Sequence, residues 1–102
     1  MLNKLVDNLK GMVYCNIYDA DWTMLYVSNG CKSLTGYEPA QLIHNHSISY
    51  EQVIVEEYRS YVRSEIAKAV AQNSSFEIEY PIQHADGHMV WVIERGYPIY
   101  SE

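Results

Sequence analysis

A predicted β-hairpin over residues 76–93 constrains the fold of this chain more than any other feature of the sequence. Apolar residues stand at every second position of its first strand: Phe76, Ile78, Tyr80 and Ile82. Glu77 and Glu79 lie between them, which is the period-two pattern of a strand with one dry face and one wet face. The residues Ala85-Asp86-Gly87 then predict a tight turn. A paired strand starts at 89–93 and is expected to continue past Gly96 towards Tyr100.

The N-terminal half predicts a second hairpin and several short helices. Residues 2–9 carry apolar side chains at helical spacing, so we expect residues 1–10 to form an amphipathic helix that caps the domain. Residues 12–18 and 23–28 predict two strands joined by a turn at 19–21. A short helix follows Ser28 or Asn29 and ends at Gly36, and another begins at Pro39 and runs to Ile43.

A long helix is predicted to begin after Ser49, where Gln52 completes the spacing of a capping box, and to end at residues 73–75. Its apolar face consists of Val55, Tyr58, Val62, Ile66, Ala69 and Val70. Antiparallel hairpins on either side of a helical block predict an α+β fold, in which the helices pack on one face of the sheet. A length of 102 residues fits a single domain over residues 1–102.

Charge and composition exclude several classes of partner. The formal net charge is −6 and the pI is about 5.1, which argues against nucleic acid or an anionic membrane as the main partner. The sequence has no signal-peptide pattern, so we expect a cytoplasmic protein with reduced thiols. Cys15 and Cys31 are interpreted as small buried hydrophobic residues.

Two stretches of the sequence resemble the PAS domain family. The first is Asp21-Trp22-Thr23-Met24-Leu25-Tyr26-Val27-Ser28 followed by Leu34-Thr35-Gly36-Tyr37, which is similar to the second strand and first helix of that family. The second is Phe76-Glu77-Ile78-Glu79-Tyr80, then Asp86-Gly87, then Trp91, which resembles the last hairpin. The resemblance covers nearly the whole chain and implies a sensor and dimerisation module of a larger bacterial signalling protein.

The sequence departs from the family pattern at two places. Val55-Glu56-Glu57-Tyr58-Arg59 stands where many members have a His-Pro segment that separates two helices, so we expect the long helix to start near Ser49 without a break. A complete PAS sheet also has a fifth, central strand, and no segment remains for it here. We therefore expect a truncated domain whose first and fourth strands have unpaired edges, which favours dimerisation or exchange of a segment.

The resemblance further implies an apolar cavity between the sheet and the helices, where a small molecule binds. The residues expected to line it are Val13, Cys15, Ile17, Leu34, Tyr37, Leu42, Tyr58, Val62, Phe76, Ile78 and Tyr80. His44 and His46 are weaker candidates for the axial ligand of a haem in that cavity. We expect no other metal site and most simply no cofactor, and the chain lacks the cysteine motif of flavin-binding light sensors.

Two functions remain open from the sequence. The chain is either a sensor of a small ligand or a ligand-free dimerisation and relay domain, with an apolar outward face near Trp91, Ile93 and Tyr97. The expected partners are a second copy of the chain and an output domain of the same parent protein. No catalytic motif occurs, so the fragment is not expected to be an enzyme; an isomerase of the ketosteroid-isomerase shape is the weakest alternative, because its elements come in another order.

Overall fold

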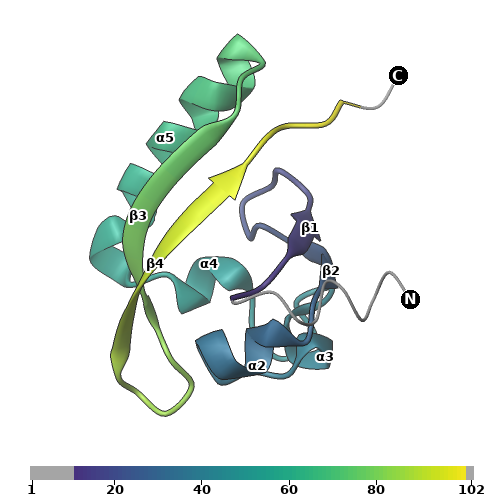
Figure 1. Cartoon of the computed structure of the whole chain (residues 1–102), viewed down its shortest axis with the longest axis vertical. Coiled ribbons are helices and arrows are strands. Elements are labelled where there is room, and N and C mark those ends of the chain that lie inside the picture. The colour runs from purple at the N-terminus through teal and green to yellow at the C-terminus, as the bar shows by residue number, and fades with distance from the viewer. Residues whose placement is uncertain (1–10, 101–102) are drawn as a thin grey trace.

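The computed structural model describes residues 11–100, in which two β-hairpins flank a block of helices (Figure 1). The first hairpin consists of β1 (Tyr14–Asn16) and β2 (Met24–Val27). The helical block holds α2 (Gly30–Thr35), α3 (Pro39–Leu42), α4 (Tyr50–Val53), the 3-10 helix η1 (Glu56–Tyr58) and α5 (Arg59–Gln72). The second hairpin consists of β3 (Phe76–Gln83) and β4 (Met89–Gly96). The helix predicted for residues 1–10 lies outside the described residues.

The β3–β4 hairpin confirms the feature from which the sequence analysis began. Its strands pair antiparallel in an unbroken register from Phe76 opposite Gly96 to Gln83 opposite Met89. Gly87 takes a φ of 103°, which a residue with a Cβ adopts only with strain, so a glycine suits this turn. Ile78, Tyr80 and Ile82 are buried, as the period-two pattern predicts.

The short helices begin and end where the sequence predicts. Gly36 closes α2 with a φ of 82° and donates its backbone N–H to the carbonyl of Lys32. Pro39 occupies the first turn of α3, and Glu38 and Gln41 form a reciprocal capping box there. These two caps fix the direction of the chain between β2 and α4.

The prediction of one uninterrupted helix from Ser49 is wrong. Ser49 and Gln52 form the expected capping box, but it heads only the four-residue helix α4. Ile54 is extended and bridges to Ile82, and the backbone N–H of Val55 donates to the carbonyl of Pro81 at 3.2 Å. Pairing with the edge of β3 therefore overrides the helical pattern at this point.

The long helix of the structure is α5, which runs along β3 (Figure 1). Val62, Ile66 and Ala69 are buried, so this part of the predicted apolar face is confirmed. The core behind them contains side chains from both hairpins and from α3 and α4, including Trp22, Met24, Leu42, Val53 and Tyr80. The fold is thus the expected α+β arrangement with helices packed on the sheet strands.

The strands form two separate two-stranded sheets within residues 11–100. The second edge of β2 is covered in part by Ile43, and the second edge of β3 by Ile54. Among the described residues, β1 pairs only with β2 and β4 pairs only with β3. The remaining edges of β1 and β4 therefore have no strand partner in this part of the chain, as expected.

Candidate functional site

Four polar side chains from three regions of the chain meet in the core. The hydroxyl of Tyr14 in β1 and the hydroxyl of Tyr80 in β3 both donate to the carboxylate of Glu94 in β4, the second at 2.6 Å. The hydroxyl of Tyr50 in α4 lies 2.7 Å from that of Tyr80. We call these residues the tyrosine–glutamate network. It joins the two hairpins and the helical block through side chains alone.

Burial shifts the acid–base behaviour of the whole network. Loss of solvation raises the pKa of Glu94 above its ordinary value, although the hydroxyls of Tyr14 and Tyr80 partly oppose this by stabilising the carboxylate. Burial also raises the pKa of Tyr14, Tyr50 and Tyr80 well above the ordinary value, and the negative charge of Glu94 adds to the effect. The tyrosines therefore stay protonated and act as hydrogen-bond donors at any physiological pH.

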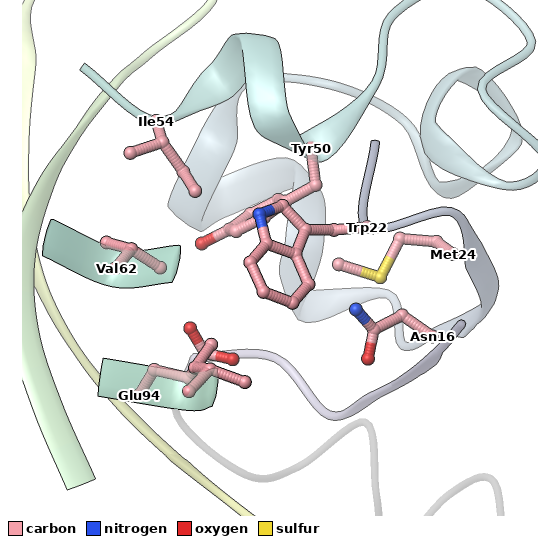
Figure 2. Close-up of a pocket in the computed structure, with 8 residues that line it drawn as sticks. Asn16, Trp22, Met24, Tyr50, Ile54, Val62 and Glu94 are labelled. Atoms are coloured by element: carbon pink, nitrogen blue, oxygen red, sulfur yellow. The ribbon is translucent and has the colours of Figure 1, made fainter. Parts of the chain in front are cut away.

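A small cavity adjoins the network. Its lining residues are Asn16, Trp22, Met24, Tyr50, Ile54, Val62, Ile66 and Glu94, most of which are labelled in Figure 2. Its volume of about 10 Å³ is roughly the space that one water molecule needs. The carboxylate of Glu94 and the amide of Asn16 give this space a polar side. The arrangement suits a single polar guest and leaves no room for a drug-sized molecule.

Trp22 forms one wall of the cavity and is held from both sides. Its indole N–H donates to the carboxylate of Glu51 at 2.9 Å. The guanidinium carbon of Arg63 lies 3.6 Å from the centre of the Trp22 ring, and Arg63 also donates to the carbonyls of Asp19 and Ala20. This cation–π contact fixes α5 to the turn between β1 and β2.

Most of the residues predicted to line a ligand cavity instead form the packed core. Leu42, Val62, Ile78 and Tyr80 are buried; Leu34, Tyr37, Tyr58 and Phe76 are partly buried against the core. Of these eight residues, Val62 alone lines the cavity described above. The ring of Tyr58 meets Trp91 edge-on at 5.5 Å between ring centres.

The prediction of which β1 side chains face the core is wrong. Val13, Cys15 and Ile17 are exposed and do not line the interior, whereas Tyr14 and Asn16 point towards it. Both sets of alternate residues in this strand contain hydrophobic side chains, so alternation alone could not decide which set faces the core. Cys15 is therefore an exposed thiol, and its interpretation as a buried residue is wrong. Cys31 is buried, as expected, and its Sγ atom lies 3.2 Å from the carbonyl of Tyr37.

The two candidate haem ligands lie at the surface and do not face the core. His44 and His46 follow α3 on an exposed turn, in which His44 and Asn45 both have positive φ values. Neither histidine lines the interior cavity. The turn directs both side chains to solvent.

Sequence reasoning also missed functional candidates that the fold brings together. Glu94 and Asn16 reach the cavity, Tyr14 bonds directly to Glu94, and Tyr50 connects to it through Tyr80. The alternation in β4 was a signal that Glu94 faces the core. Val90 and Val92 point towards the core, whereas Trp91 and Ile93 lie on the other face. Glu94 is two positions after Val92 and therefore lies on the core side.

The opposite side of the strands is unusually apolar for a surface. We define the outer face as the exposed side chains directed away from Tyr14 and Glu94, namely Val13, Cys15, Ile17, Tyr26, Met89, Trp91 and Ile93. Trp91 and Ile93 are 53% and 54% exposed, and Tyr97 beyond β4 is exposed as well, so the predicted outward face is confirmed. An ion pair between Arg95 and Glu77 borders it, with 3.0 Å between Nε and the carboxylate.

Comparisons with known proteins agree on the fold. The sequence of residues 24–102 matches the family model described as PAS fold. The chain is similar to the PAS domain of a protein from Colwellia psychrerythraea, with a TM-score of 0.79 and 24% identity over 97% of this chain and 80% of that one. It is also similar to an RNA-binding light-oxygen-voltage receptor, with a TM-score of 0.77 and 19% identity over 98% of this chain and 28% of that one.

A further structural neighbour is the light-oxygen-voltage domain of the blue-light photoreceptor Aureochrome1, with a TM-score of 0.63 and 18% identity over 91% of this chain and 70% of that one. No curated protein matches the sequence. None of the helices in residues 11–100 combines the length and the apolar character that crossing a membrane requires. The family model spans well over half of the chain, and the architecture agrees with it. The chain therefore belongs to the PAS fold family.

Proposed function

We propose that this chain is a sensory PAS domain that relays a signal through self-association, with a second copy of the chain bound to its outer face. The observation that carries the proposal is the exposure of Trp91, Ile93 and Met89 in one row on β4. Exposed aromatic and aliphatic side chains that gather on one face, with charged residues at the border, are typical of protein interfaces. A sensory role is supported by the structural neighbours, two of which are named as light-oxygen-voltage receptors or photoreceptors.

The packing of the core supports the relay function over a preformed ligand site. A cavity of about 10 Å³ is far below the several hundred Å³ of a typical small-molecule pocket. A ligand that needs a pocket of the larger size would have to displace Trp22, Tyr50 or Met24, all of which are buried. The other parts of the proposal are a cytoplasmic setting in a larger bacterial signalling protein, an output domain on the same parent chain as the second partner, and no catalysis by the domain itself.

Sedimentation of the purified chain over a range of concentrations tests the proposal. We expect a monomer–dimer equilibrium that Trp91→Ala weakens by about 30-fold or more, because buried tryptophans at interfaces commonly contribute about 2 kcal/mol. Ile93→Thr keeps the β-branched shape and serves as a second variant if Trp91→Ala unfolds. Tyr61→Ser is the matched control, because Tyr61 is 44% exposed but lies on α5.

Two results would contradict the proposal. One is a wild-type chain that stays monomeric at the highest concentration, and the other is a dimer that neither outer-face variant weakens. Native mass spectrometry and an absorbance spectrum of the same sample separate the relay from the ligand sensor. A dimer of bare chains supports the relay, whereas a small molecule that copurifies at one per chain supports the ligand sensor and overturns our proposal.

A further inference from the structure

The turn between β3 and β4 brings three potential metal ligands together. His84, Asp86 and His88 stand at every second position, and within residues 11–100 they are the group of histidine, cysteine and acidic side chains whose ligand atoms converge, all lying within 4.8 Å of one another. The rings of His84 and His88 stack with 4.6 Å between their centres. The two imidazoles therefore lie on the same side of the turn as they approach the carboxylate of Asp86.

The backbone holds this turn in place without a metal ion. The N–H of His84 donates to the carbonyl of His88, and the N–H of Gly87 donates to the carbonyl of His84, both at 2.8 Å. The N–H of Ala85 donates to the carbonyl of Thr35 at 2.8 Å, which attaches the turn to the end of α2. A site that is already ordered loses little conformational entropy when it binds a ligand.

Packing also fixes the innermost ligand. The side chain of His84 is only 19% exposed, and its ring lies against Gly36, where a Cβ would stand 2.6 Å from the Cε1 atom of the ring. A larger residue at position 36 would displace the imidazole. His88 is 58% exposed and Asp86 is similarly open, so an ion could enter from solvent and complete its coordination shell with water.

The hydrogen bonds around His84 leave two electron-pair donors facing each other. The Nδ1 atom of His84 accepts the backbone N–H of Asp86 at 3.2 Å, and a ring nitrogen that accepts a hydrogen bond carries no proton. The Oδ1 atom of Asp86 lies 3.2 Å from the same nitrogen. The Nδ1 atom of His88 contacts that oxygen as well. A cation bound by these three atoms would replace the hydrogen bond that Nδ1 of His84 accepts, because that nitrogen has a single lone pair.

The distance between one pair of ligand atoms fits a first-row divalent metal ion, and the closer contact between His88 and Asp86 would lengthen when the ion binds. Zinc binds imidazole nitrogen and carboxylate oxygen at about 2.0–2.2 Å, so two ligands at tetrahedral or octahedral angles are separated by about 2.9–3.5 Å. The 3.2 Å between Nδ1 of His84 and Oδ1 of Asp86 falls in that interval. Two imidazoles and one carboxylate favour zinc, cobalt, nickel or copper over magnesium or calcium, which prefer oxygen ligands.

We propose that His84, Asp86 and His88 form a binding site for a divalent transition metal ion at the β3–β4 turn. The proposal is independent of self-association, because the turn lies beyond the paired part of the hairpin and uses none of the outer-face residues. The sequence analysis expected no metal site at this turn.

Titration of the tag-free chain with Zn²⁺, followed by calorimetry, tests this site, and Co²⁺ gives a second readout through its visible absorption. We expect one metal ion per chain for the wild type. His88→Ala and Asp86→Asn should each weaken binding by about tenfold or more, since each removes one of three ligands. Both positions are exposed, so these variants are expected to fold, and circular dichroism verifies it; His84→Ala is avoided because its ring packs against Gly36.

His46→Ala and Cys15→Ser are the matched controls, because both residues are exposed potential ligands outside the turn. They should bind Zn²⁺ as the wild type does. The proposal is overturned if the wild type binds no Zn²⁺ in the micromolar range, if His88→Ala binds it unchanged, or if binding is lost in a control variant instead. A cobalt spectrum that stays the same in Asp86→Asn would equally exclude the carboxylate as a ligand.

Discussion

Replacing Tyr80 by Phe removes one hydroxyl from the tyrosine–glutamate network and leaves the aromatic ring in place. That hydroxyl is fully buried, donates to Glu94 at 2.6 Å and lies 2.7 Å from the hydroxyl of Tyr50. A hydrogen bond to a charged group contributes about 1.5–3 kcal/mol, and a buried donor left without an acceptor adds a further cost. We therefore expect the free energy of unfolding to fall by about 2–3 kcal/mol, which is a large share of the stability of a domain of this size.

Urea denaturation followed by circular dichroism measures this loss. With a slope of about 2 kcal/mol per molar urea, the midpoint should fall by about 1 M or slightly more. Tyr61→Phe is the control, because it makes the same chemical change at an exposed position of α5 and should stay within about 0.5 kcal/mol of the wild type. If Tyr80→Phe is as stable as Tyr61→Phe, the network does not stabilise the fold and our assignment of its energy is refuted.

Two further predictions concern the network and the end of α2. Burial raises the pKa of Glu94, so the folded state holds this proton more tightly than the unfolded chain does, and stability falls as pH rises from about 4.3 through the folded-state pKa. Glu94→Gln should flatten that decline, and an unchanged profile of unfolding free energy against pH would contradict it. Gly36→Ala should cost about 2 kcal/mol in thermal or urea unfolding, because φ is 82° and the added Cβ meets His84. Ser33→Ala, at an exposed position of the same helix, should be close to neutral.

The parts of the fold that follow from local sequence were predictable. The β3–β4 hairpin, the end of α2 at Gly36 and the capping box at Ser49 each depend on residues within a few positions of one another. The break after α4 was not predictable in this way, since it depends on pairing between Ile54 and Ile82. Local patterns indicate the secondary structure that a segment favours, and contacts between residues distant in the sequence decide where that preference is overridden.

The candidate site was less predictable for the same reason. The network connects β1, α4, β3 and β4, so no residue spacing within a single segment predicts it. The facing of β1 was undecidable from alternation, because Tyr14 and Cys15 are both plausible core residues by type. The cluster at the β3–β4 turn was visible as His84-Ala85-Asp86-Gly87-His88, but only the turn geometry shows that its side chains converge.

The two separate hairpins also have a consequence for the order of events in folding. The pairing within each of the two hairpins is local, whereas the contact between Tyr14 and Glu94 spans 80 positions in the chain. Loop closure over such a separation comes late, after nearby contacts have formed. Substitutions in the network should therefore accelerate unfolding and leave the refolding rate nearly unchanged, so that this cluster sets the lifetime of the native state more than the speed at which it is reached.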